Sequence, residues 1–176
     1  MLGEIRDVET AEAAIRAALT GHLVISTIHT NTAAGAITRL LEMNIEPFLI
    51  SSAINGVIAQ RLVRVLCPHC KKEYTPLYEI KQKVEEHLEP GTVKRLASAQ
   101  GCEHCLQSGY TGRTGIFEIL KVNAEIREMI LRQKSERELN QKAIENGMKT
   151  LRADGMRKVE QKITSIEEII SITNRE

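Results

Sequence analysis

Four cysteines form the clearest chemical pattern in this sequence. Cys67 and Cys70 make one Cys-x-x-Cys pair, Cys102 and Cys105 make another, and residues 71–101 separate the pairs. Four thiolates at this spacing can hold Zn²⁺ in a tetrahedral site that is closed to solvent and therefore structural. A reactive dithiol and an empty site are the alternatives for the same residues. The pattern predicts a structural zinc site with these four ligands.

A carboxylate and an imidazole form a second candidate site. Glu4 follows a short apolar stretch together with Arg6 and Asp7. His29 ends the apolar and β-branched stretch 23–29. Hydrolysis of a phosphoanhydride requires a carboxylate that orients or deprotonates water and a polar group near the terminal phosphate. Glu4 and His29 suit these two roles, although the first stretch taken alone also fits a strand end with a surface ion pair.

A sheet edge must bring Glu4 and His29 together. The first three residues read as the end of a strand, Asp7 can cap a helix over 11–19, and residues 23–29 have the composition of a second strand. The order strand, helix, strand with short joints predicts a parallel βαβ unit in a RecA-type or other doubly wound sheet. Ligands of such sheets bind beyond the carboxyl ends of the strands, where both side chains would lie.

The remaining elements follow from caps, periodicity and turn residues. Ser135 and Ser165 each stand three residues before a glutamate, which is the capping-box pattern, and Thr150 is a helix start. The sequence predicts a helix over 33–43 capped by Thr32, a helix from Pro47 through Ile58, a strand over 61–66, a helix over 77–88, a glycine-rich loop over 109–115, a strand over 116–122 and helices thereafter.

Composition narrows the class of protein. The 176 residues carry 24 basic and 23 acidic side chains, so the formal net charge of +1 gives no electrostatic case for nucleic acid. No apolar run reaches the roughly 18 residues that a membrane-spanning helix requires, and the N-terminus lacks the layout of a secretory signal. The expected compartment is the cytosol.

Several segments read together carry a family resemblance. Residues 3–10 and 20–31 are similar to Walker B and His-box segments, and residues 35–40, 45–48, 59–70 and 109–118 extend the similarity. The chain thereby resembles the secretion ATPases, the hexameric motors of type II secretion and type IV pilus assembly, over nearly all of residues 3–175. The cysteine-bearing insertion favours the assembly or secretion branches over the retraction motors.

The resemblance implies a fold class and a division of the chain. The fold is expected to be α/β, the C-terminal part of a RecA-like P-loop ATPase domain with a tetracysteine zinc-binding insertion. Residues 1–66 would belong to the ATPase domain, 67–112 to the zinc-binding subdomain and 113–176 to a mostly helical C-terminal subdomain.

The resemblance also implies roles for single residues. Glu4 would be the catalytic carboxylate near Mg²⁺, and His29 would lie near the terminal phosphate of ATP. A P-loop, Gly-x-x-x-x-Gly-Lys-Ser/Thr, occurs nowhere in the 176 residues. The chain is therefore expected to be the C-terminal portion of a longer motor and to be inactive by itself.

Four further residues are candidates for nucleotide contacts. Arg6 and Asp7 belong to the Walker B segment, although a salt bridge and a helix cap explain them about as well. His22 matches the family pattern, but a histidine after a helix more often contacts the helix C-terminus. Arg113 could contact nucleotide or a neighbouring subunit, or could simply stand in a turn.

Partners and location follow from the resemblance in the same way. The parent protein would be a hexamer that binds secretion or pilus platform proteins at the inner membrane, from the cytoplasmic side and without nucleic acid. The alternative is a binding module, ordered by zinc, that docks a partner and has no catalytic activity.

Overall fold

The computed structural model describes residues 1–174 and has an α/β fold. The chain packs into two compact units, one built from residues 1–59 and 118–148 and the other from residues 60–117 and from 149 onwards. In chain order the elements are α1 (Val8–Leu19), α2 (Ala33–Glu42), α3 (Pro47–Ala53), β1 (Gly56–Leu66), β2 (Lys72–Tyr74), α4 (Tyr78–Glu85), β3 (Leu96–Ser98), the 3₁₀ turn η1 (Glu103–Cys105), β4 (Tyr110–Lys121), α5 (Ala124–Leu131), α6 (Glu136–Glu145), α7 (Leu151–Glu160) and α8 (Ile166–Thr173).

Five helices of the first unit share one hydrophobic core. Helix α1 begins after Asp7, whose carboxylate accepts a hydrogen bond from the Thr10 amide at 2.8 Å, as the predicted cap requires. Helix α2 begins after Thr32 in the same way. The core takes apolar residues from all five helices and from the end of β4, among them Ile15, Ile37, Leu40, Ile50, Leu120, Ile126, Ile130 and Leu139.

The predicted strand over 23–29 is wrong as a regular element. Residues 22–30 are extended but lie in no strand. Two backbone hydrogen bonds join them to the N-terminal segment, from the Leu2 amide to Ile25 and from the Ile5 amide to Thr27. The two segments therefore run side by side in the same direction, as the βαβ interpretation requires. These two hydrogen bonds do not make up the continuous ladder that defines a strand pair.

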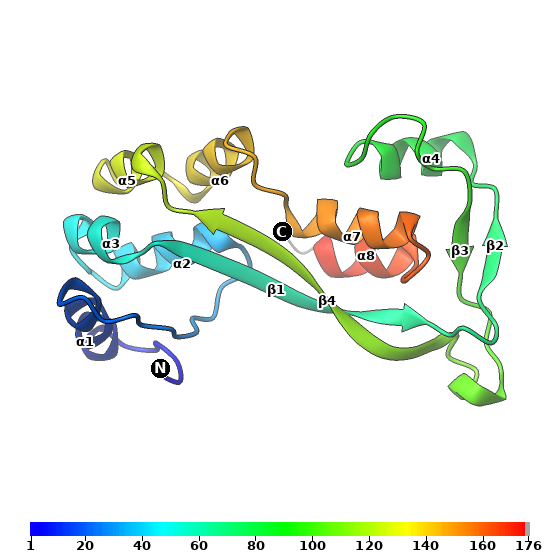
Figure 1. The fold of residues 1–176 in the computed structure, drawn as a ribbon, viewed down its shortest axis with the longest axis horizontal. Coiled ribbons are helices and arrows are strands. Elements are labelled where there is room, and N and C mark those ends of the chain that lie inside the picture. The colour runs from blue at the N-terminus through cyan, green and yellow to red at the C-terminus, as the bar shows by residue number, and fades with distance from the viewer. Residues whose placement is uncertain (175–176) are drawn as a thin grey trace. The chain divides into compact units, whose positions relative to one another are not determined.

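Strands β1 and β4 pair over a longer stretch than the sequence indicates. The Val122 amide donates to Asn55 at one end and the Cys67 amide donates to Gly109 at the other, so the strands are antiparallel (Figure 1). The predicted helix from Pro47 through Ile58 is wrong beyond Ala53, and the predicted loop over 109–115 is wrong from residue 110 onwards. Cross-strand hydrogen bonds outweigh the local glycine signal there.

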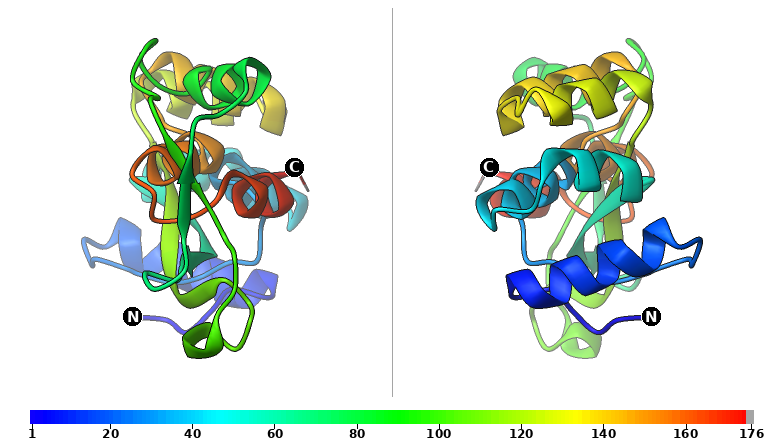
Figure 2. Two further views of the ribbon diagram at one scale, coloured as in Figure 1. Left: turned by 90° about the vertical axis from the view of Figure 1, so that its right-hand side faces the viewer. Right: turned by 90° about the vertical axis from the view of Figure 1, so that its left-hand side faces the viewer.

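The second unit combines a small sheet with three helices. Strands β2 and β3 are antiparallel, with Lys72 opposite Ser98 and Tyr74 opposite Leu96. Helices α7 and α8 pack side by side (Figure 2). Gly155 allows this close approach, because an added Cβ would lie 2.8 Å from a methyl group of Ile169.

The two compact units do not coincide with the predicted segments 1–66, 67–112 and 113–176. The division of the chain into these three segments stays a prediction. The last two positions of the third segment lie outside the described residues. Among residues 1–174, no helix is long and apolar enough to cross a membrane.

Candidate functional site

Glu4 and His29 lie next to each other in the first unit. The Nε2 atom of His29 is 3.1 Å from a carboxylate oxygen of Glu4, and the other oxygen accepts a hydrogen bond from Arg6 at 2.6 Å. The two backbone hydrogen bonds of residues 1–5 to residues 25–27 bring the segments together. The His29 side chain is 87% exposed and that of Glu4 is 31% exposed, so the pair is open to water.

The charge of Arg6 tunes the Glu4 carboxylate. Its hydrogen bond, together with the smaller effect of His29, lowers the pKa of Glu4 below its usual value despite some desolvation. Glu4 is therefore ionised at neutral pH and is a weak proton acceptor. The arrangement favours a carboxylate that orients water or a metal over one that abstracts a proton.

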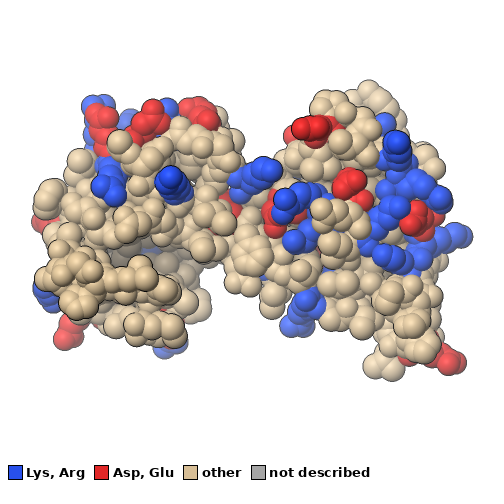
Figure 3. Space-filling view, in the orientation of Figure 1, with Lys and Arg blue, Asp and Glu red and all other residues tan. Residues whose placement is uncertain are grey.

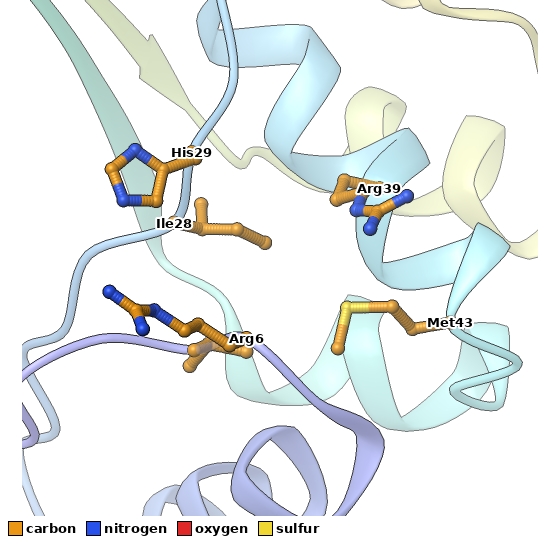
Figure 4. A pocket seen from close by; sticks show the side chains of 6 residues that line it. Arg6, Ile28, His29, Arg39 and Met43 are labelled. Carbon is orange, nitrogen blue, oxygen red and sulfur yellow. The ribbon is translucent and has the colours of Figure 1, made fainter.

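A hollow of about 310 Å³ lies beside this pair (Figure 4). Arg6 and His29 project into the same space from the two extended segments, and Arg39 and Met43 line it from α2 and its C-terminal end. Both arginines of this lining are ion-paired, Arg6 with Glu4 at 2.6 Å and Arg39 with Glu42 at 3.2 Å, so neighbouring carboxylates balance their charges.

Asp7 and His22 make local contacts at the two ends of α1. Asp7 is the N-cap, and its pKa is lowered by the hydrogen bonds from Thr10. The Nδ1 atom of His22 lies 3.3 Å from the Ala17 carbonyl and 3.1 Å from the Thr20 hydroxyl, at the C-terminus of the helix. These contacts match the structural alternatives for both residues, and their roles toward nucleotide stay predictions.

Arg113 belongs to the second unit, on the exposed side of β4. Burial opposes ionisation of Glu168, but hydrogen bonds from Arg64, with the smaller effects of the Arg64 and Arg113 charges, outweigh it and lower the pKa of Glu168. The structure thus gives Arg113 an electrostatic neighbour within its own unit, and a contact with nucleotide stays a prediction.

Two carboxylates contact the residues that follow the His29 segment, and the sequence did not predict either contact. Glu118 accepts a hydrogen bond from the Ala33 amide at 2.9 Å, and Glu136 accepts one from the Thr32 hydroxyl at 2.5 Å. Glu118 stands within the matched stretch 109–118, and that position was its only signal. Nothing in the sequence around Glu136 links it to Thr32.

The four cysteines converge in the second unit. Their sulfur atoms all lie within 4.8 Å of one another, with Cys67–Cys102, Cys70–Cys105 and Cys102–Cys105 at 3.9, 3.8 and 3.7 Å. A tetrahedron with Zn–S bonds of about 2.3 Å has edges of about 3.8 Å. The sulfur positions therefore fit one tetrahedral metal ion.

Backbone amides surround the sulfur atoms. The amides of Cys102 and Gly109 donate to the Cys105 sulfur at 3.2 Å each, and the Gly101 amide donates to Cys70 at 3.4 Å. Burial opposes ionisation of Cys105, but these hydrogen bonds outweigh it and lower the pKa of this thiol to about 6. Burial raises the pKa of Cys70 to about 11. A metal ion would supply the positive charge that four thiolates need.

Comparison with known proteins gives a consistent set of matches. The model of the family "Type II/IV secretion system protein" matches residues 1–171. Over the whole chain, 49% of residues are identical to the type II secretion system protein E of Pseudomonas aeruginosa, of which the match covers 34%. The chain is 51% identical over 98% of its length to the type IV pilus assembly ATPase PilB of Thermus thermophilus, covering 20% of that protein.

Solved structures agree at the level of the fold. The pilus retraction motor PilT, crystallised with bound ADP, superposes with a TM-score of 0.62 at 26% identity over 97% of this chain and 38% of that one. The chain thus spans about a fifth to a third of the curated relatives named here.

Proposed function

The chain belongs to the type II/IV secretion system protein family, and from this we propose that it is part of an ATPase that couples ATP hydrolysis to type II secretion or type IV pilus assembly. The 3.1 Å contact between Glu4 and His29 carries the proposal. A carboxylate and an imidazole from separate segments meet beside a hollow, and such groups can orient water and contact a terminal phosphate in phosphoanhydride hydrolysis.

Each residue has a defined task in this proposal. Glu4 orients the attacking water and the Mg²⁺ ion, in keeping with its lowered pKa. His29 contacts the terminal phosphate, and Arg6 keeps Glu4 ionised. Asp7, His22 and Arg113 have supporting roles: Asp7 and His22 fix the ends of α1, and Arg113 is a candidate contact for nucleotide.

Substitution of Glu4 by glutamine in the full-length protein tests this function. The amide keeps the shape of the side chain but removes the charge, so we expect ATP binding to persist while turnover falls at least about 100-fold. Steady-state ATPase assays and binding of a nonhydrolysable ATP analogue measure the two effects. Glu12→Gln, on α1 and outside the Walker B-like residues 3–10, is the matched control. Turnover near the wild-type rate in Glu4→Gln would remove Glu4 from its role.

The 176 residues alone should hydrolyse ATP only at the background rate, because they contain no P-loop to hold the phosphates. We place ATP and Mg²⁺ in the longer protein and a structural Zn²⁺ at the four cysteines. Turnover by this chain that depends on Glu4 would contradict the proposal.

The proposal also covers the assembly and the location of the full protein. By family membership, the full protein would act as a hexamer on inner-membrane platform proteins from the cytoplasmic side, without nucleic acid. Residues 1–66, 67–112 and 113–176 would be its ATPase, zinc-binding and helical parts. The second candidate is a zinc-ordered binding module without catalysis, and the sulfur geometry is the observation that supports it.

A further inference from the structure

We propose that Glu118 and Glu136 are positioning residues for His29, a role that rests on the proposed function. Both carboxylates contact the N-terminus of α2, which begins four residues after His29. Glu118 lies on β4 and Glu136 opens α6, and both belong to the same compact unit as His29.

Glu118 is a buried carboxylate with a specific task. Its side chain is 2% exposed, and it accepts a hydrogen bond from the Ala33 amide, the first amide of α2. The first amides of a helix have no partner within the helix, and the helix dipole attracts negative charge at that end. Glu118 therefore satisfies a buried donor and is itself stabilised by the helix.

Glu136 binds Thr32, the residue that precedes Ala33 and caps α2. Its carboxylate accepts a hydrogen bond from the Thr32 hydroxyl, and the same hydroxyl accepts one from the Gly35 amide at 2.9 Å. A Cβ on Gly35 would lie 2.9 Å from the Thr32 hydroxyl and 3.2 Å from Glu136. The position thus needs glycine, because Thr32 and Glu136 fill the space that a side chain would occupy.

These contacts matter for His29 because its own segment is not part of a helix or strand, so contacts with neighbouring elements must fix its position. Residues 22–30 lie in no helix or strand. Hydrogen bonds to Ile25 and Thr27, and one from the Thr27 hydroxyl to the Gly3 carbonyl, tie the middle of the segment to residues 2–5. Ile28 packs against the core, and the α2 N-terminus ties the end of the segment. The His29 ring is largely exposed, so packing does not fix it. Moving the second anchor would shift the imidazole relative to Glu4.

The test measures kcat and KM for ATP in the full-length protein. The variants are Glu136→Ala and, as its matched control, Glu145→Ala. Both residues are exposed on α6, and Glu145 is bound by Lys142 and Gln141 of the same helix. Glu118→Ala and Glu118→Gln form a second pair. Active sites are counted with a nonhydrolysable ATP analogue, so that partial unfolding does not pass for slow turnover.

We expect Glu118→Ala and Glu136→Ala to lower kcat per active site about tenfold or more, because small displacements of a reacting group slow chemistry strongly. KM for ATP should stay within about twofold of wild type, since the P-loop holds the phosphates. Glu118→Gln should restore part of the rate, because its amide oxygen still accepts from Ala33. Amide hydrogen exchange at Ala33 and Gly35 should accelerate in the alanine variants.

Wild-type kcat in both Glu118→Ala and Glu136→Ala would overturn the inference, as would unchanged amide exchange at Ala33 and Gly35. If Glu118→Ala gives no folded protein, Glu136→Ala decides the question alone. Normal turnover of Glu4→Gln would overturn the proposed function and this inference together. A dead Glu4→Gln with fully active Glu118 and Glu136 variants would remove the inference and leave the proposed function standing.

Discussion

Exposed carboxylates of this chain are tuned by the groups that donate to them. Glu138 illustrates this on α6, where it receives hydrogen bonds from the Lys134 ammonium, the Ser135 hydroxyl and the Ser135 amide. These donors lower its pKa to about 2. The Ser135 hydroxyl also accepts from the Glu138 amide, which confirms the predicted capping box.

Glu138 therefore predicts a pH dependence of stability. A carboxylate with a pKa of about 2 in the folded chain and 4.5 as its ordinary value stabilises the fold fully above pH 4.5. This contribution is lost as the pH falls from 4.5 towards 2. The melting temperature of the wild type should exceed that of Glu138→Gln at pH 7, and the difference should shrink between pH 4.5 and 2. A difference that grows on acidification would contradict the assignment.

At the scale of elements, a partly buried polar contact joins β1 to α8 within the second unit. The Glu168 carboxylate accepts hydrogen bonds from the backbone amide and the guanidinium of Arg64, which stacks on the Tyr110 ring at 4.0 Å. The Thr164 hydroxyl donates to the Arg64 carbonyl at 2.7 Å. Arg64 stands three residues before Cys67, so the contact also fixes the end of the strand that leads into the first cysteine pair.

The Arg64 contact changes the capping of α8. The Ser165 hydroxyl accepts from the Glu168 amide, as the capping box predicts. The Glu168 carboxylate, however, contacts Arg64 and not the Ser165 amide, so the second half of the predicted box is wrong. A charged partner from a distant strand provides a stronger hydrogen bond than a local amide does.

Substitution of Glu168 by glutamine should destabilise the second unit by about 2 kcal/mol, the scale of a charge-assisted hydrogen bond in a buried site. Denaturation by urea measures the change in the free energy of unfolding. Glu167→Gln is the matched control, since Glu167 is the exposed neighbour on the same helix. Equal effects of the two substitutions would contradict a structural role for the Arg64 contact.

For the whole molecule, the hydrophobic core cluster draws its residues from the first unit, and the four cysteines belong to the second. On the face displayed in Figure 3, basic and acidic side chains are intermixed, in keeping with the near-zero net charge. A structural metal ion contributes about 10 kcal/mol or more to the folding of small domains. Its removal should therefore act mainly on the unit that contains it.

Elemental analysis of freshly purified, reduced protein should find one zinc ion per chain. After chelation, amide hydrogen exchange should accelerate in residues 60–117 and 149–174, while core amides of residues 33–45 and 124–143 stay protected. The variant Cys70→Ser should show the accelerated pattern before any chelator is added. Absence of zinc from the wild type, or equal acceleration in both units, would contradict a structural site.

Local signals were sufficient for most helices and for the grouping of the four cysteines. Asp7, Thr32, Ser135 and Thr150 start helices as predicted, because capping is a contact between a side chain and amides two or three residues later. The spacing of the cysteines indicated the candidate ligand set for a similar reason, because each Cys-x-x-Cys pair is a local feature of four residues. The motif context of Glu4 and His29 predicted their pairing, which the structure places at 3.1 Å.

Contacts between distant residues were decided by the tertiary structure. Strand β4 extends through a glycine-rich stretch because β1 supplies its hydrogen-bond partners, and no local pattern encodes that pairing. Glu168 meets Arg64 from 104 residues away, and Glu118 meets Ala33 from 85 residues away. The sequence by itself determined which residues could do chemistry. Only the fold determined which carboxylates position those residues. A buried carboxylate must be paired with a donor, and the packing of distant segments decides which donor lies within reach.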